Sequence, residues 1–290
     1  MHARPLNARN AIEIIRRFRE RRRFHVVTPK RFVKVYCGQQ KHALNRELAA
    51  ALFIPTRQPW KHVNLVFNRN LIHAGPGTIA YAPRIKGSPP SPDQCRAIAA
   101  ELLEHMSPSI PLAPWCRTVG PHVISEIVPN LDAGTWAHLE HHLNGVMLPS
   151  TGAHGDLKDV NMLIDGGRGF FIVDWEFFRP EGSAIEDICR LLAISVRSER
   201  VQAGLPFVPG EDVHIIWNSH VMRQVSETCQ LTELQAIALE IISRASCERL
   251  GGRNLSLVLG DMRTRVNAFS QLEESDHAMQ SCNDISTKAR

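Results

Sequence analysis

The sequence predicts an α+β fold in which a small β-rich lobe precedes a mainly helical lobe. Three observations predict this arrangement. Segments rich in β-branched and aromatic residues dominate the front of the chain, up to about residue 88. Beyond residue 184, apolar residues recur almost throughout at helical spacing. Between the two patterns, residues 154–176, HGDLKDVNMLIDGGRGFFIVDWE, place several carboxylates around an expected turn.

Bulk properties place the chain among ordinary globular proteins. Its 290 residues suffice for one large domain or two lobes, and 43% of them are hydrophobic. No apolar run reaches the roughly 20 residues of a membrane-spanning helix, and the first residues lack the apolar core of a secretory signal. The 7 cysteines have no close pairs, which indicates free thiols in a reducing compartment. We therefore expect a cytoplasmic protein.

Residues 1–23 form the first expected element, a basic helix. Residues 1–34 carry eleven Lys/Arg and only two Glu. A solvated helix held by one apolar stripe is the plainer interpretation, and contact with an anionic membrane surface is the alternative. Because no nucleic-acid-binding motif accompanies this charge, we expect no nucleic-acid partner. A peripheral membrane contact through residues 1–23 stays open.

Strand and helix signals alternate through the rest of the small lobe. Two β-rich runs flank residues 28–30 and predict a hairpin, and residues 41–53, KHALNRELAAALF, predict a helix. Residues 61–86 are again strand-like, with a Gly-Pro-Gly turn at residues 75–77. We expect these strands to form one sheet.

The larger lobe begins with a helix that Ser91 caps, and Gln94 completes the capping box. Residues 122–128, HVISEIV, predict a strand, and residues 133–148 predict a helix. After residue 184 the pattern predicts helices, one of which begins at a second capping box near residue 232. The polar residues at the end of the chain are expected to fray.

Two histidines on the expected helix 133–148 have a spacing found in zinc enzymes. His138 and His142 are four residues apart, so they share one helical face. The sequence is not H-E-x-x-H, and it offers no evident third ligand. We therefore interpret the pair as part of a solvated or packed helix face.

The central stretch predicts a hairpin with polar groups at its open end. Apolar runs flank residues 165–169, DGGRG, a composition that demands a turn. Antiparallel pairing about this turn puts Asn161 opposite Asp174, and Asp156, in the loop before the hairpin, can face the same point. A carboxylate and an amide oxygen suit Mg²⁺, and a further carboxylate could orient a hydroxyl while the metal neutralises a phosphate. Ordinary turn chemistry is the plainer interpretation.

The order H-x-D-x4-N, a hairpin and then D-W-E resembles the catalytic centre of the protein-kinase-like superfamily. It is most similar to the aminoglycoside phosphotransferase and choline kinase branch, whose loop commonly has the form H-G-D-x4-N. The resemblance implies a two-lobed protein-kinase-like fold that uses ATP and Mg²⁺. It makes Asp156 the catalytic residue and Asn161 and Asp174 the metal ligands. It also implies that His154, and Asp187 on the following helix, support the catalytic loop.

Lys158 gives the loop the form H-G-D-L-K, which also resembles Ser/Thr protein kinases, where this lysine approaches the transferred phosphate. One spacing argues against a protein substrate, because Asp174 and Asp187 are thirteen residues apart, too few for the activation segment of a protein kinase. The resemblance therefore favours a small hydroxyl-bearing acceptor, similar to an aminoglycoside, choline or a sugar. Acidic side chains that could bind a cationic acceptor are Glu126, Asp132, Glu140, Glu181 and Glu186.

A kinase-like fold also needs a strand lysine for the nucleotide phosphates and a helix glutamate that orients it. Lys34 in RFVKVY and Glu47 in NRELAAAL fit, because Lys34 alternates with apolar neighbours. A solvated edge-strand lysine is the plainer alternative. Lys86 and Glu101 form a rival pair, which would bring Glu126 near the adenine. We favour Lys34 and Glu47, and the rival stays open.

These expectations divide the chain into a basic helix, a nucleotide-binding lobe, a catalytic and acceptor-binding lobe, and a frayed tail. Their bounds are residues 1–23, 24–88, 89–275 and 276–290. The expected function is ATP-dependent transfer of the γ-phosphoryl group to a hydroxyl of a small molecule. Two alternatives stay open: a non-catalytic kinase-like module that binds nucleotide or a partner, and a lipid or lipopolysaccharide-sugar kinase at the membrane surface.

Overall fold

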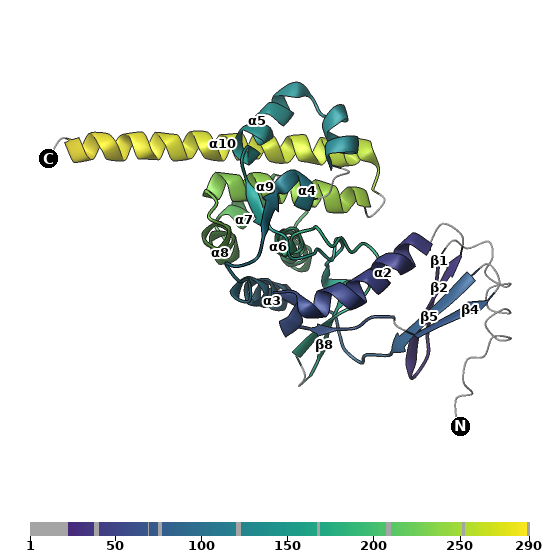
Figure 1. Ribbon diagram of the computed structural model, residues 1–290. Helices are drawn as coiled ribbons and strands as arrows, with labels where there is room; N and C mark the ends of the chain where they lie inside the picture. Colours follow the sequence, from purple (N-terminus) through teal and green to yellow (C-terminus); the bar gives the residue numbers. More distant parts are fainter. Residues whose placement is uncertain are drawn as a thin grey trace.

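The structure is a computed structural model in which a small β-rich lobe adjoins a larger helical lobe (Figure 1). The residues that it describes are 23–37, 41–68, 70–74, 77–119, 123–166, 169–206, 210–250 and 253–288. The predicted α+β class and its division into a β-rich front and a helical back are confirmed. The predicted basic helix, and with it the membrane contact through residues 1–23, lies outside the described residues except for Arg23.

The small lobe is an antiparallel sheet of four strands in the order β1-β2-β5-β4, with helix α2 beside it (Figure 1). The bounds are β1 Arg23–Val27, β2 Arg31–Cys37, β4 Asn70–Ala74, β5 Gly77–Pro83 and α2 Lys41–Phe53. The predicted hairpin and the helix 41–53 are therefore confirmed. Val33, Lys34 and Val35 are all buried, so strand β2 is covered on both faces. The alternative of a solvated edge-strand lysine is therefore wrong. A buried lysine on an inner strand requires a partner for its charge.

A second, smaller sheet lies at the junction of the two lobes. It has the order β3-β9-β8, with bounds β3 Asn64–Leu65, β8 Met162–Asp165 and β9 Gly169–Ile172. Two short 3₁₀ turns, Ile54–Thr56 and Trp60–His62, precede β3. Strand β3 runs parallel to β9, so the connection between α2 and β4 is attached to the predicted hairpin.

The large lobe is built on helices, with a two-stranded β6-β7 ladder. The helices are α3 Pro92–Glu104, α4 Trp115–Thr118, α5 Ala133–Leu143, α6 Ala184–Gln202, α7 Glu211–Trp217, α8 His220–Cys229, α9 Glu233–Leu250 and α10 Leu255–Lys288, and the strands are β6 Leu112–Pro114 and β7 Met147–Pro149. Helix α6 contacts α3, α7, α8 and α9, and is therefore the centre of this lobe. Both predicted capping boxes form, at Ser91 with Gln94 and at Thr232 with Gln235.

The strand expected at residues 122–128 is wrong. The predicted strand at residues 122–128 is a π-helical turn, Val123–Ile127, followed by a 3₁₀ turn, Val128–Asn130. Val123 and Ile127 are both fully buried, and a spacing of four residues on one face is helical. The β-branched composition suggested a strand, but the burial of this segment follows a helical period instead.

The expected fraying of the end of the chain stays a prediction. Helix α10 continues to Lys288 and projects beyond the other elements (Figure 1). Residues 276–288 contain neither Gly nor Pro, so no residue type in this segment forces the helix to end. No helix of the described residues is long and apolar enough to span a membrane.

An aromatic cluster joins the two lobes beneath the second sheet. Trp175 is fully buried and lies with its ring centroid 5.3 Å from that of Trp60 and 5.5 Å from that of Phe67. Trp60 also donates a hydrogen bond from Nε1 to the carbonyl oxygen of Gly152, at 3.0 Å. Large buried aromatic side chains dominate core energetics, so this cluster fixes the connection before β4 against the loops that follow β7 and β9.

The capping box of α3 gives a direct test of the helical assignment. Replacing Ser91 by Ala removes the acceptor of the Gln94 N–H, and we expect a loss of about 1 kcal/mol in the free energy of unfolding. Urea denaturation of Ser91→Ala measures this loss. The control is Ser256→Ala, an exposed position in the first turn of α10, where we expect a change below about 0.5 kcal/mol. Equal effects of the two substitutions would contradict the cap.

Candidate active site

The first turn of α6 supports the loop that carries Asp156. Asp187 accepts hydrogen bonds from the backbone N–H of His154, at 2.6 Å, and of Gly155, at 3.0 Å. Burial raises the pKa of Asp187, and the two backbone donors oppose that rise. Gly155 has φ +79°, and a Cβ there would lie 2.5 Å from the carbonyl oxygen of Phe177. Glycine is therefore required at this position.

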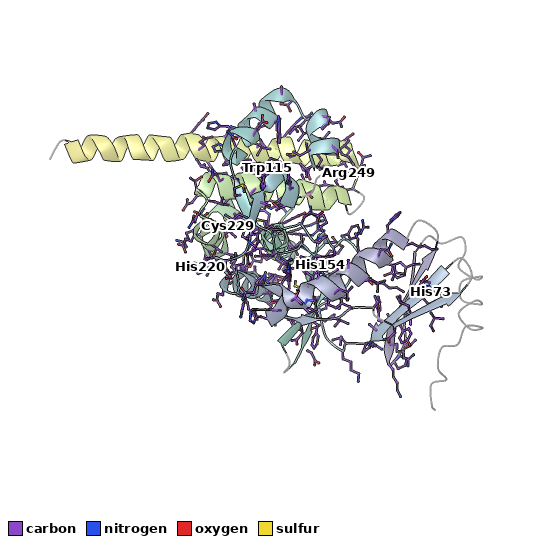
Figure 2. All side chains as sticks on the ribbon, in the orientation of Figure 1. His73, Trp115, His154, His220, Cys229 and Arg249 are labelled. Atoms are coloured by element: carbon purple, nitrogen blue, oxygen red, sulfur yellow. The ribbon has the colours of Figure 1, made fainter. Side chains whose placement is uncertain are left out.

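His154 connects this loop to the end of strand β9. The ring is fully buried at the junction of the lobes (Figure 2), and burial lowers its pKa to about 4. A neutral ring has one donor and one acceptor nitrogen. His154 Nε2 donates to the carbonyl oxygen of Val173, at 2.9 Å, and Nδ1 accepts from the Asp156 N–H, at 3.3 Å. The histidine therefore orients the loop and is not placed as a base.

Asp156 is buried and its carboxylate is surrounded by donors. Arg190 Nη2 lies 2.6 Å from Oδ1, and Lys158 Nζ lies 2.7 Å from Oδ2. The sequence prediction placed Lys158 at a nucleotide phosphate, whereas the structure places it beside this carboxylate, with a third of the side chain exposed. Arg190 was missed. Its signal was the spacing from Asp187, because residues three apart on a helix share a face.

Asn161 lies at the end of the same loop, and its amide is oriented by Asp156. Asn161 Nδ2 donates to the backbone carbonyl of Asp156, at 2.8 Å, and to its carboxylate, at 3.2 Å. This orientation leaves the amide Oδ1 as the group that could bind a cation. The predicted register of the hairpin differs by one residue, since Val173 N–H donates to the carbonyl of Asn161 and Met162 pairs with Ile172.

Asp174 therefore follows the paired residues instead of facing Asn161. Its backbone has φ +67°, a left-handed conformation that is uncommon for residues other than glycine and is concentrated at functional sites. The hairpin was predicted by counting symmetrically from the turn, and a count cannot show where a strand leaves its extended conformation. Asp174 and Asn161 still line the same cavity.

Lys34 joins the two lobes through its ammonium group. It forms ion pairs with the carboxylates of Glu47 on α2 and Asp174 beyond β9. Burial lowers the pKa of Lys34, but the two carboxylates outweigh that effect and raise it overall. Glu47 also accepts from Tyr36 Oη, at 2.9 Å, and from Asn68 Nδ2, at 2.8 Å. These two partners were missed in the sequence, because neither is near Glu47 along the chain.

The rival pair is not brought together. Lys86 is exposed on the connection after β5 and Glu101 lies on α3, and the ion pairs of the described residues do not include a contact between them. Lys34 and Glu47 therefore form the lysine–glutamate pair that faces Asp174. The predicted strand near Glu126 is helical, and Glu126 instead pairs with Arg249, at 2.9 Å.

A cavity of about 340 Å³ lies between the sheet of the small lobe and the hairpin. Its lining is apolar over most of the surface and polar where Asn68, Asn161 and Asp174 meet. The apolar residues include Val27, Phe32, Val66, Ala82, Ile85 and Leu163. The connection after β5 is fixed on the hairpin by Ser88, whose carbonyl accepts from the Ile164 N–H at 2.8 Å. Such a cleft suits a flat apolar ring with an anionic group at its polar end.

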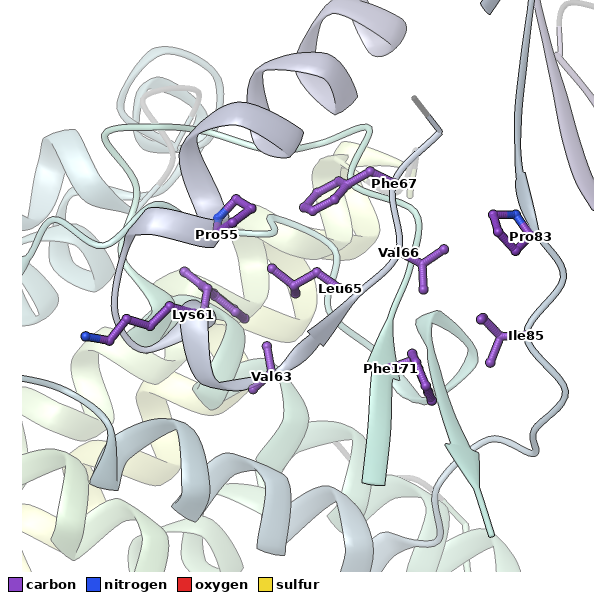
Figure 3. Close-up of a pocket in the computed structure, with 10 residues that line it drawn as sticks. Pro55, Lys61, Val63, Leu65, Val66, Phe67, Pro83, Ile85 and Phe171 are labelled. Carbon is purple, nitrogen blue, oxygen red and sulfur yellow. The ribbon is translucent and has the colours of Figure 1, made fainter. Parts of the chain in front are cut away.

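A second cavity, of about 530 Å³, adjoins the first (Figure 3). Val66, Pro83 and Ile85 line both cavities, and Phe171 closes the second from the hairpin side. Among the described residues, Lys61 is the only charged one in its lining. The first cavity is therefore the one whose lining side chains could take part in a reaction.

Comparisons with known proteins found similarity only in the fold. The sequence matches no family model, and no curated protein matches it. The structure is similar to solved aminoglycoside phosphotransferases, the branch that the sequence resembled. One is APH(4)-Ia, with 11% identity and a TM-score of 0.49 over 88% of this chain and 97% of that chain. Another is APH(3'')-Id from Streptomyces rimosus, with 13% identity and a TM-score of 0.47 over 82% of this chain and 99% of that chain.

A third similar structure is a streptomycin–ATP complex of APH(2'')-IIa, with 13% identity and a TM-score of 0.39 over 81% of this chain and 99% of that chain. These values describe a similarity of fold. The chemistry of the cleft depends on the contacts of its own residues.

The buried, neutral His154 predicts a specific pH dependence. Its pKa is lowered from 6.5 to about 4 on folding, so between these values the unfolded chain binds a proton there and the folded chain does not. The free energy of unfolding therefore falls as the pH is lowered, and this residue accounts for about 2 kcal/mol of the loss at pH 5. His154→Gln, which keeps a donor and an acceptor, should lack that part of the loss.

Urea denaturation of the wild type and of His154→Gln at pH 7 and pH 5 measures the difference. The control is His220→Gln, at an exposed position on α8, whose profile should follow the wild type. Parallel profiles for the wild type and His154→Gln would show that the buried ring does not stay neutral.

Proposed function

We propose that the chain transfers the γ-phosphoryl group of ATP to a hydroxyl of a small molecule. The observation that carries the proposal is the meeting of Lys34, Asn161 and Asp174 at one end of the cleft, next to Asp156. These residues come from both lobes and from three separate segments. Phosphoryl transfer requires positioning and neutralisation of charge above all, and this set supplies a cation, oxygen ligands and a carboxylate.

ATP fits the division of the cleft into an apolar and a polar part. The adenine would lie between the apolar residues of the small lobe and Leu163 of the hairpin. The phosphates would extend toward Lys34, whose position is fixed by Glu47. A buried lysine with a raised pKa remains protonated, so it can pair with phosphate oxygens when they displace part of its contact with Asp174.

Mg²⁺ fits the donor set at the polar end of the cleft. Asp174 supplies a carboxylate and Asn161 an amide oxygen, and hard oxygen donors together with substrate phosphates are the usual ligands of this ion. When bound, the ion would neutralise charge on the phosphates. The left-handed backbone of Asp174 turns its carboxylate toward Lys34, which keeps it at the cleft.

Asp156 would orient the acceptor hydroxyl and receive its proton. Arg190 and the amide of Asn161 fix the position of the carboxylate, and positioning of the reacting groups is a large part of such catalysis. Lys158 is the most exposed of its partners. It is therefore placed to move from Asp156 to an oxygen of the transferred group.

A small acceptor is favoured by what the chain does between Asp174 and α6. Residues 175–183 pack back onto the catalytic loop, where Ala153 and Arg179 form a β-bridge. Gly152 N–H also donates to the carbonyl of Gly182, at 2.9 Å. This segment is used in supporting the loop, which leaves little chain for docking a peptide.

The acidic residues that could bind a polycation are partly neutralised. Glu126 pairs with Arg249 and Asp132 pairs with Arg263, each at 2.9 Å. Glu186 is buried and pairs with Arg179. Glu140 and Glu181 are exposed.

Screening ATP consumption against aminoglycosides, choline and sugars is the way to identify the acceptor.

The roles of the two aspartates give the functional prediction. Asp156→Asn keeps the shape of the side chain but removes the base, and we expect turnover to fall by about 10²–10⁴-fold. Asp174→Asn should abolish turnover and remove the Mg²⁺ dependence of ATP binding, because a neutral amide binds Mg²⁺ poorly. Phosphate transfer and calorimetric binding of ATP with and without Mg²⁺ measure these effects.

The matched control is Asp159→Asn on the same loop, whose carboxylate caps the Val160 N–H and lies outside the cleft lining. Turnover should be close to that of the wild type. Full turnover in Asp174→Asn would overturn the proposal. Mg²⁺-dependent ATP binding by the wild type without transfer to any acceptor would instead support a binding module that does not catalyse the reaction.

A further inference from the structure

Helices α5 and α10 bring together three side chains of the kind that bind transition metals. His138 and His142 come from α5 and Glu273 from α10. One ligand atom from each residue lies within 4.8 Å of the other two. None of the three lines the cleft described above. The third ligand, which is not evident from the sequence, is 131 residues after His142 along the chain.

The two nitrogen–oxygen distances in this cluster are longer than those of good hydrogen bonds. His138 Nε2 lies 3.6 Å and His142 Nε2 lies 3.5 Å from the two oxygens of the Glu273 carboxylate. Good hydrogen bonds to nitrogen are about 2.7–3.2 Å long. Zinc bonds of about 2.0–2.1 Å in tetrahedral geometry separate neighbouring ligand atoms by about 3.3–3.4 Å.

The surroundings orient both rings toward the carboxylate. Phe269 of α10 lies with its ring centroid 5.1 Å from each imidazole, in an edge-to-face arrangement. His142 Nε2 is buried and makes no hydrogen bond with the described residues. A buried nitrogen without a hydrogen bond requires an explanation. His138 Nε2 has one further neighbour, Ser270 Oγ at 3.3 Å, a contact that a metal would replace.

We propose that His138, His142 and Glu273 bind a Zn²⁺ ion that fastens α10 to α5. Two imidazoles and one carboxylate are a common ligand set for zinc, with water in the fourth position, whereas Mg²⁺ prefers oxygen ligands. The ligands bridge the two helices, and α10 continues for fifteen residues beyond Glu273, to Lys288. A bond to both helices at this point stabilises their packing.

The test is a Zn²⁺ titration of the full chain after treatment with a chelator, in competition with a chromophoric zinc indicator. We expect one Zn²⁺ per wild-type chain and a higher thermal unfolding temperature when it binds. His142→Ala and Glu273→Gln should each weaken the affinity by at least about 100-fold. Co²⁺ in place of Zn²⁺ should give the visible absorption of tetrahedral coordination, which both variants should lose.

Two controls separate this site from others. His141→Ala changes the exposed histidine beside His142 and should leave the Zn²⁺ affinity unchanged. Asp174→Asn, in the cleft, should also leave it unchanged, and unfolding curves in chelator show that each variant is folded. Absence of binding by the wild type, equal affinity in Glu273→Gln, or loss of binding in Asp174→Asn would each overturn the proposal.

Discussion

The arrangement of the protein depends on one buried cation. Lys34 is 1% exposed, and its ammonium group lies between Glu47, on a helix of the small lobe, and Asp174, beyond the hairpin. A buried charge is tolerated when it is paired and hydrogen-bonded. The strand, the helix and the segment after the hairpin must therefore keep these relative positions. Two carboxylates facing each other without the lysine would repel, so the same ion pairs that join the lobes also hold the polar end of the cleft together.

Apolar packing fixes the loops on either side of these ion pairs. Trp175 directly follows Asp174 and is fixed in the aromatic cluster with Trp60. Its ring centroid lies 4.6 Å from that of His154, and His154 in turn binds the carbonyl of Val173. Core and site are thus built from adjacent residues of one segment. A substitution that loosens the aromatic cluster would shift Asp174 relative to Asp156 without touching either side chain.

Local signals in the sequence predicted the local features of the structure. The hairpins, the helix 41–53 and both capping boxes depend on residues within a few positions of one another, where turn chemistry and periodicity act. Lys34 and Glu47 were found because the kinase-like resemblance calls for a strand lysine and a helix glutamate, and Lys34 alternates with apolar neighbours. Asp187 was found because the resemblance implies an aspartate on the helix that follows the motif.

Features that depend on distant residues were missed or misplaced. Tyr36 and Asn68 meet at Glu47 only because β2 and the connection before β4 flank α2, and Arg190 reaches Asp156 only because α6 packs beneath the loop. The strand predicted at residues 122–128 failed because its burial follows a helical period, which composition alone does not show. Glu273 belongs to the same class, since helix packing and not spacing brings it to His138 and His142.

The role of Lys34 is measured most directly by calorimetric binding of Mg²⁺–ATP to the wild type and to Lys34→Met, which keeps the length of the side chain without its charge. Lys34 supplies the cation at the polar end of the cleft, so we expect binding by the wild type that is at least about tenfold tighter than binding by the variant. Folding of the variant is checked by its unfolding curve. Equal affinity in a folded Lys34→Met, or no binding of Mg²⁺–ATP by the wild type, would contradict this role of Lys34.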